Sequence, residues 1–218
     1  MSNIFIGIRS CNLYQNYREA QRDTWLPSLI KLANESIVDY KYFVGNGIPQ
    51  LYLEKDVVVL NVDDSMQYLT IKTKLMFEYV IDHKYDHLFF TEDDTYVVPM
   101  RLIASGFQYH DYTGNMNSKS NLGFPYMNGH AYWISRPAIQ LVLDSGVLDK
   151  PGLNEDALIG ATLFGMYEFN NDTRYTAYRP ENGQLDPLAS NQIIATHKAT
   201  PDVMRQVHKA YLESFKNV

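Results

Sequence analysis

Short apolar runs alternate with longer amphipathic stretches over the first hundred residues. The apolar runs are rich in β-branched and aromatic side chains and end at turn residues, which predicts buried strands at residues 3–8, 39–45, 56–62 and 87–91. Apolar positions of helical period predict the clearest helix at 65–84 and another at 16–26. This alternation predicts an α/β fold with a central, mostly parallel sheet flanked by helices.

The pattern after residue 98 mixes short helices, loops and an aromatic strand. It predicts helices at 99–107, 136–145, 154–164 and 201–215, a polar loop at 111–122, a strand that leads out of a binding loop within 123–135, and a strand at 191–196. Neither an internal repeat nor a linker interrupts the chain. We therefore expect one domain that spans residues 1–218.

Acidic residues stand where two of the predicted strands end. Asp63 and Asp64 follow one strand, and Glu92, Asp93 and Asp94 follow another. Ligands of open α/β sheets bind at the carboxyl ends of the strands, and Mg²⁺ and Mn²⁺ prefer carboxylate ligands. A run of three acids taken alone is more often a solvated turn, so the pattern leaves both interpretations open.

Composition excludes several other classes. The 218 residues are 45% hydrophobic and 20% charged, as in a globular protein, and the net charge of −6 with scattered basic residues argues against nucleic acid as the partner. A single cysteine, Cys11, rules out an intrachain disulfide framework and suits a reducing compartment. Without a signal-peptide core or an apolar run of membrane-spanning length, we expect a soluble cytoplasmic protein with no transmembrane segment. Oligomeric state leaves no signal in the sequence.

Two pairs of charged residues each allow two interpretations. Arg18 and Arg22 share one helix face, where they would either grip a diphosphate or be solvated. Glu155 and Asp156 follow a capping Asn154, and acids in the first turn of a helix are favoured by the helix dipole without any further function. The dipole also favours the ionised form of Asp156.

Seven short motifs follow one another in the order of a known family. They are residues 18–25 (REAQRDTW), 42–45 (YFVG), 64–73 (DSMQYLTIKT), 92–97 (EDDTYV), 126–135 (YMNGHAYWIS), 155–160 (EDALIG) and a late His197 before P-x-x-M. Together they resemble the β-1,3-galactosyltransferase/Fringe family of inverting glycosyltransferases. The family's N-terminal anchor and lumenal disulfides are missing, as expected for a compact soluble member of microbial or viral type or for a trimmed catalytic domain.

The resemblance implies a single GT-A (Rossmann-like) domain and transfer of galactose, glucose, an N-acetylhexosamine or a similar sugar from a UDP-sugar to a hydroxyl of a glycan or glycoconjugate. Residues 1–97 would bind the nucleotide-sugar and 98–218 the acceptor. Asp94 and His197 would hold Mn²⁺ or Mg²⁺, and Asp156 would be the general base. Further roles implied are nucleotide contacts for Arg18, Arg22, Asp64, Lys72, Glu92 and Asp93, and sugar contacts for Tyr126, Asn128, Gly129, His130, Trp133 and Glu155.

Several residues depart from the family pattern or keep a second interpretation. Glu92 replaces the first aspartate of the metal motif, Met66 and Tyr68 replace the usual Tyr and Asn, and His130 stands where a small residue is common. Trp133 fits the core equally well. Two other functions stay open, a nucleotide-sugar hydrolase and a non-catalytic sugar- or nucleotide-binding protein of the same fold.

Overall fold

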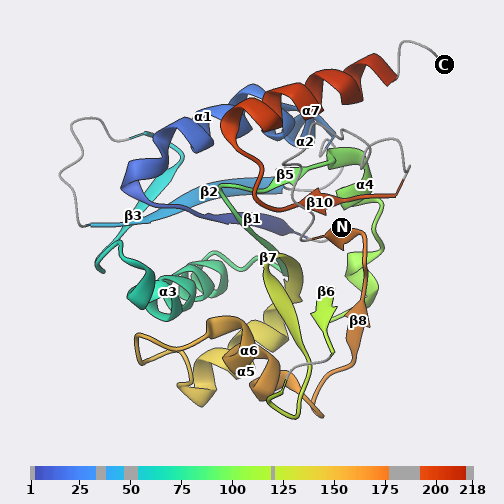
Figure 1. Ribbon diagram of the computed structural model, residues 1–218. Helices are drawn as coiled ribbons and strands as arrows, with labels where there is room; N and C mark the ends of the chain where they lie inside the picture. The colour runs from blue at the N-terminus through green and yellow to red at the C-terminus, as the bar shows by residue number, and fades with distance from the viewer. Residues whose placement is uncertain (1–2, 33–37, 47–53, 119–120, 177–191, 215–218) are drawn as a thin grey trace.

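A seven-stranded sheet runs through the computed structural model, which describes residues 3–32, 38–46, 54–118, 121–176 and 192–214 (Figure 1). The strand order is β3-β2-β1-β4-β7-β6-β8, and the bounds are β1 Ile4–Arg9, β2 Val38–Gly45, β3 Val57–Leu60, β4 His87–Glu92, β6 Tyr112–Asn117, β7 Tyr126–Ser135 and β8 Phe169–Asn171. Only β7 runs antiparallel to its neighbours in this sheet. The predicted α/β fold with a mostly parallel central sheet is confirmed.

Helices cover both faces of the sheet (Figure 1). One face packs against α1 (Gln15–Asp23), α2 (Trp25–Leu32), α4 (Pro99–Ile103) and α7 (Pro201–Ser214), and the other against α3 (Leu69–Asp82), α5 (Arg136–Ser145) and α6 (Glu155–Leu163). Strand β1 contributes to the cores on both faces, because successive side chains of a strand point to opposite faces of the sheet. Ile4 and Ile6 belong to the first core, whereas Phe5 belongs to the second.

A smaller sheet brings the late part of the chain beside the central strands. It consists of β5 (Tyr96–Val97), β10 (Ala195–Thr196) and β9 (Tyr175–Thr176), with β10 between the other two. The backbone N–H of Ala199 also donates to the carbonyl of Asp94 over 2.8 Å. His197 is thereby held next to the turn that follows β4.

The predicted helix at 16–26 is two helices, because the chain breaks at Thr24. The Thr24 hydroxyl donates back to the carbonyl of Ala20 over 2.6 Å, and Pro27 occupies the first turn of α2, where its missing N–H costs nothing. The predicted helix at 99–107 is likewise shorter. It ends at Ile103, and Phe107–Tyr109 form a 3-10 turn, η3.

Two predictions for the second half were wrong in part. Residues 111–122 were expected to form a loop, yet Tyr112–Asn117 form β6 between β7 and β8. The sequence carries no strand signal here, because the side chains are largely polar and Gly114 has a low strand propensity. Backbone pairing with both β7 and β8 stabilises the strand nevertheless. The expected strand at 191–196 is confined to Ala195–Thr196 in the described chain.

Two further 3-10 turns lie at the carboxyl edge of the sheet, η1 (Asn12–Tyr14) after β1 and η2 (Met66–Tyr68) before α3. Among the residues that the structure describes, no helix is both long enough and apolar enough to cross a membrane.

Candidate functional site

The two central strands β1 and β4 end side by side, and their last residues carry opposite charges. Arg9 and Glu92 are register partners at these ends. The backbone N–H of Asp93 donates to the Arg9 carbonyl (3.1 Å), and that of Thr95 donates to the Glu92 carbonyl (3.2 Å). Gln21 of α1 donates to the carbonyls of both Glu92 and Thr95. The acidic run therefore lies in a turn that its surroundings hold in place.

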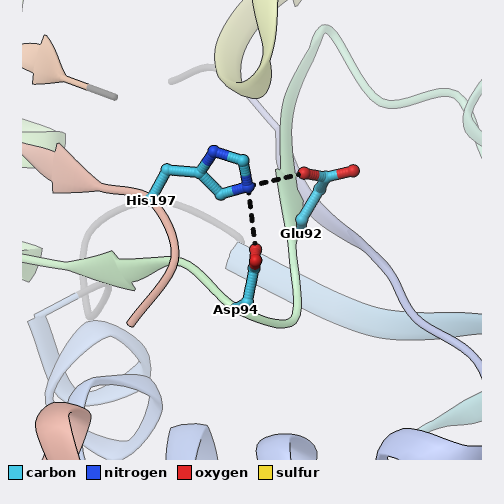
Figure 2. A group of neighbouring side chains, drawn as sticks. All are labelled: Glu92, Asp94 and His197. Carbon is cyan, nitrogen blue, oxygen red and sulfur yellow. Dashed lines mark ion pairs between the residues drawn. The ribbon is translucent and has the colours of Figure 1, made fainter. Parts of the chain in front are cut away.

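Glu92, Asp94 and His197 converge at this turn (Figure 2). The Nε2 atom of His197 lies 3.1 Å from Oε2 of Glu92 and 3.1 Å from Oδ1 of Asp94. One ligand atom from each residue lies within 4.8 Å of the others. Each side chain remains partly exposed, so the group is open to a ligand.

This group fits a divalent metal. Oδ1 of Asp94 is buried, and apart from its ion pair with His197 the described structure gives it no hydrogen-bond partner. Two carboxylates and one imidazole form a donor set that Mn²⁺ accepts. Burial alone would raise the pKa of Glu92, but Arg9 and His197 lower it to about 2, which keeps this carboxylate ionised. Burial lowers the pKa of His197, but Asp94 and Glu92 outweigh it and raise the pKa to about 9.

The sequence had paired Asp94 with His197 and left Glu92 and Asp93 as supporting groups. The structure places Glu92 in the group with them and turns Asp93 away. The carboxylate of Asp93 is buried and accepts from the Ser10 hydroxyl over 2.6 Å. Burial, together with the charges of Asp94 and Glu92, raises its pKa to about 7.

A cavity of about 410 Å³ opens beside the acidic turn, and we call it the Lys72 cavity. Its lining residues are Arg9, Ser10, Cys11, Leu13, Tyr14, Asp64, Ser65, Met66, Leu69, Lys72, Glu92, Asp93 and Asp94. The buried ammonium of Lys72 donates to the Ser10 carbonyl (2.5 Å) and to Oδ1 of Asp64 (2.6 Å). An ammonium has three donors, so Lys72 keeps one for a ligand.

Asp64 organises one wall of this cavity. Its Oδ1 also accepts from the backbone N–H of Gly45 (2.7 Å), and its Oδ2 accepts from that of Asn12 (2.6 Å). Gly45 is required here, because a Cβ at this position would lie 2.8 Å from the backbone nitrogen of Asp64. Asp64 is predicted to lie near a uridine, and it does line the Lys72 cavity. Its carboxylate already binds three groups of the protein, namely Lys72, Gly45 and Asn12.

Arg18 and Arg22 share one face of α1, as predicted, but both form ion pairs with acidic residues of the protein. Arg18 is buried and donates to Glu54 (3.2 Å) and to the Cys11 carbonyl (2.7 Å). Arg22 binds Glu54 and forms a two-point pair with Asp56. Neither arginine lines the Lys72 cavity. Their charges are balanced within the fold, which weakens their predicted part in diphosphate binding.

A second cavity of about 350 Å³, the Asp156 cavity, adjoins the first at Arg9 and Glu92. Its lining residues are Arg9, Glu92, Asn128, Gly129, His130, Asp156, His197 and Lys198. Oδ2 of Asp156 accepts from the Gly129 backbone N–H (2.8 Å), whereas its buried Oδ1 has no partner in the described structure. A Cβ at Gly129 would lie 2.6 Å from Oδ2, so a glycine is needed for this approach.

The helix start is expected to favour the ionised form of Asp156, but the net shift of its pKa is upward. Burial raises its pKa to about 7, and the neighbouring charge of Glu155 adds to the rise, while Arg9 and the Gly129 hydrogen bond oppose it. Asn154 does cap α6, through a hydrogen bond from the Ala157 backbone N–H to its side chain. The dipole effect is too small to offset removal of a carboxylate from water.

The remaining predicted sugar-contact residues separate into two groups. Asn128 and His130 line the Asp156 cavity with Gly129. Trp133 instead lies in the core, fully buried, with its ring stacked on Phe107 at 3.8 Å. Its place on β7 puts it on the face toward that core, so its predicted contact with a sugar is corrected.

Tyr126 and Glu155 also lie outside the lining of the Asp156 cavity. The Tyr126 hydroxyl accepts from the Asn117 side chain over 2.8 Å. Glu155 is buried and forms an ion pair with Arg9. Glu155 is therefore a structural partner of Arg9, and its predicted contact with substrate stays a prediction that this position does not favour.

Sequence reasoning missed Arg9, which joins the two cavities. Its guanidinium binds Glu92 (2.5 Å) and Glu155, donates to the Thr73 hydroxyl (3.2 Å) and lies 5.0 Å from the centre of the Phe90 ring. Burial lowers its pKa, but Glu92 and Glu155 outweigh this effect and raise it. One sequence feature could have indicated Arg9. It is the charged residue that ends the first apolar run, just as Glu92 ends the run that forms β4.

Lys198 was also missed. It follows His197, adopts a left-handed φ of 60° and lines the Asp156 cavity. Such a conformation is rare for residues other than glycine, and no sequence pattern predicts it.

No family model matches the sequence, and no curated protein matches it. Solved structures do. The chain resembles the glycosyltransferase GlyE of Streptococcus pneumoniae TIGR4 with a TM-score of 0.53 and 10% identity, over 100% of this chain and 64% of GlyE. It also resembles a glycosyltransferase involved in the glycosylation of the major capsid of PBCV-1, with a TM-score of 0.51 and 11% identity over 96% of this chain and 99% of that one. The chain thus spans less than two thirds of GlyE, and its fold is the GT-A fold of these glycosyltransferases.

Proposed function

We propose that this protein is a metal-dependent glycosyltransferase that moves a sugar from a UDP-sugar to a hydroxyl of a glycan, with inversion at the anomeric carbon. The observation that carries the proposal is the arrangement of two functional groups around one cavity. Glu92 and His197, two members of a group that could hold a metal ion with Asp94, line the Asp156 cavity, and so does Asp156, a carboxylate with an oxygen that has no hydrogen-bond partner in the described structure. Such a pairing serves a reaction with a charged leaving group and an activated hydroxyl.

The Lys72 cavity suits the nucleotide part of the donor. Leu13, Tyr14 and Met66 offer it apolar surface for a base, and Lys72 lines the same cavity with a third ammonium donor that a diphosphate would accept. Bound Mn²⁺ or Mg²⁺ would act as a Lewis acid toward the diphosphate oxygens. Glu92, Asp94 and His197 would hold the ion, and Ser10 keeps Asp93 directed away from it.

Asp156 is the proposed base. Its Oδ1 would accept the proton of the acceptor hydroxyl while that oxygen forms its bond to the anomeric carbon, and the bond from that carbon to the diphosphate oxygen breaks with its electron pair on the diphosphate. The backbone N–H of Gly129 donates to Oδ2 of Asp156, and this hydrogen bond fixes the orientation of the carboxylate and therefore of Oδ1. A single displacement of this kind inverts the anomeric centre.

The order of the sequence motifs supports assignment to the β-1,3-galactosyltransferase/Fringe family. We further propose that residues 1–97 bind the nucleotide and residues 98–218 the acceptor, since Lys72 and Asp156 belong to different parts of the chain. The donor would be a UDP-hexose or a UDP-N-acetylhexosamine.

Calorimetric titration with UDP tests the metal part of the proposal. We expect UDP to bind with Mn²⁺ present and to bind at least about tenfold more weakly, a difference of about 1.4 kcal/mol, after chelation. Asp94→Asn should reproduce the chelated result, because it replaces a ligand oxygen without a change of size. Asp144→Asn, at an exposed aspartate on α5, is the matched control and should bind as the parent does. Equal UDP affinity with and without the metal would contradict the proposal.

A further inference from the structure

His130 occupies an unusual place at the base of the Asp156 cavity. The residue is only 3% exposed, yet it lines this cavity. Its backbone carbonyl accepts from the hydroxyls of Thr91 (3.0 Å) and Thr95 (3.3 Å), so strand β4 and the acidic turn both fix it. Its ring stacks on that of His197, with the ring centres 5.1 Å apart and the planes 8° apart. Two hydrogen bonds therefore fix the backbone of His130, and its imidazole packs against that of His197.

This ring keeps a polar atom without a partner. Nε2 of His130 is buried and forms no hydrogen bond within the described structure. A buried polar atom left unsatisfied costs about 1–3 kcal/mol. Most such atoms in folded proteins have a partner, and the exceptions need an explanation. Since His130 lines a cavity of about 350 Å³, a bound molecule can supply the missing partner.

The neighbours of His130 show which part of a substrate this would be. On one side lies His197, which belongs to the metal-binding group and thus to the leaving diphosphate. On the other side the preceding residue, Gly129, holds the base Asp156 and thus marks the attacking hydroxyl. In a single displacement, the sugar being transferred lies between the leaving group and the nucleophile. His130 contacts His197 through its ring, follows the residue that contacts Asp156, and lines the same cavity as both.

We infer that His130 determines donor specificity by a hydrogen bond between its Nε2 and one hydroxyl of the sugar being transferred. The inference rests on the proposed function, since it assigns the sugar of the donor to the space between His197 and Asp156. A site built to hydrogen-bond a substrate hydroxyl rejects the analogue that lacks it, because the buried polar group is then left unpaired. The donor is accordingly a sugar with a hydroxyl at this position, and the corresponding deoxy sugar is a poor one.

Binding of donors in the absence of acceptor tests the inference without turnover. The probes are UDP, UDP-galactose, UDP-glucose and UDP-N-acetylglucosamine, together with the monodeoxy analogues of the sugar that binds best, each titrated with Mn²⁺ present. We expect one monodeoxy analogue to bind about tenfold more weakly than its parent, as the loss of about 1.4 kcal/mol requires.

His130→Phe, which keeps a planar ring and removes both nitrogens, should bind the parent sugar about tenfold more weakly and bind that analogue unchanged. His130→Gln, which can still offer a polar atom, should recover part of the difference. The affinity for UDP alone serves as the control for folding and metal binding, and it should be the same in all three proteins.

The outcomes separate the two proposals. Failure of the parent protein to bind UDP or any UDP-sugar with Mn²⁺ present would overturn the proposed function. If donors bind but His130→Phe retains the full preference for the parent sugar over every analogue, the role of His130 is wrong while the proposed function stands. A parallel loss of affinity for UDP in His130→Phe would also overturn the inference, since His130 would then act on the nucleotide site.

Discussion

At the scale of single residues, three acids near one strand end differ in the protons that they bind. Arg9 and His197 hold the pKa of Glu92 at about 2, whereas burial raises the pKa of both Asp93 and Asp156 to about 7. Different environments thus keep one carboxylate ionised, as the proposed metal site requires, and give another a pKa that suits the proposed proton transfer near neutral pH. The sequence placed Glu92 and Asp93 correctly at a strand end and Asp156 in the first turn of a helix. It could not rank their pKa values, because these depend on Arg9 and on burial.

If Asp156 is the base, as proposed, the rate of transfer should depend on pH. A base must be deprotonated, so with a pKa of about 7 the value of kcat/KM should rise about tenfold per pH unit at acid pH and level off above about pH 7. Burial and Glu155 raise this pKa, and Arg9 opposes them. Asp156→Asn should lower transfer by about 10²–10⁴-fold and keep UDP affinity. Release of UDP from a UDP-sugar, measured with acceptor across the pH range, checks both. A flat profile, or normal turnover by Asp156→Asn, would refute the assignment of the base.

At the scale of secondary-structure elements, the sequence predicted β1 to β4, α3 and α5 with nearly correct bounds. Their hydrophobic patterns follow directly from which face is buried. β6 was missed because a strand between two others draws its stability from backbone pairing, and its polar side chains give no periodic signal. In the smaller sheet, only β10 falls within a predicted strand, whereas β5 and β9 escaped prediction because they have two residues each. This sheet brings His197 to Asp94, so the position of one proposed metal ligand depends on contacts that no local pattern reveals.

The end of α3 offers a test of local backbone strain. Lys84, exposed and just after the C-cap residue His83, has a left-handed φ of 61°, which disfavours any residue with a Cβ. Lys84→Gly should therefore raise the free energy of unfolding by about 0.5–1 kcal/mol, measured by urea denaturation. Lys84→Ala is the matched control, because it removes the same charge but keeps the Cβ, and it should give no gain. Equal stabilisation by both variants would show that the lysine charge, rather than the backbone, is responsible.

At the scale of the whole molecule, one buried cation connects distant parts of the chain. Arg9 and Glu92 belong to the first half of the sequence, whereas Glu155 begins a helix that packs against β7 in the second half. Arg9 thereby joins the Lys72 cavity to the Asp156 cavity, both of which it lines. Sequence patterns describe each half separately, so a contact between residues 9 and 155 lay beyond their reach.

Removal of Arg9 alone should lower the free energy of unfolding strongly, whereas removal of Arg9 together with Glu155 should lower it much less. Arg9→Met leaves the buried carboxylate of Glu155 without its cation, which we expect to lower the free energy of unfolding by about 3–5 kcal/mol. Arg9→Met combined with Glu155→Leu should recover most of that loss, because no unpaired charge is then buried. Arg205→Met, which breaks an exposed pair with Asp23 between α7 and α1, is the control and should cost less than about 1 kcal/mol. Urea unfolding of the three variants gives the comparison. A double variant no more stable than Arg9→Met would show that Arg9 stabilises the fold through its other contacts, with Glu92, Thr73 and the Phe90 ring, rather than through the neutralisation of Glu155.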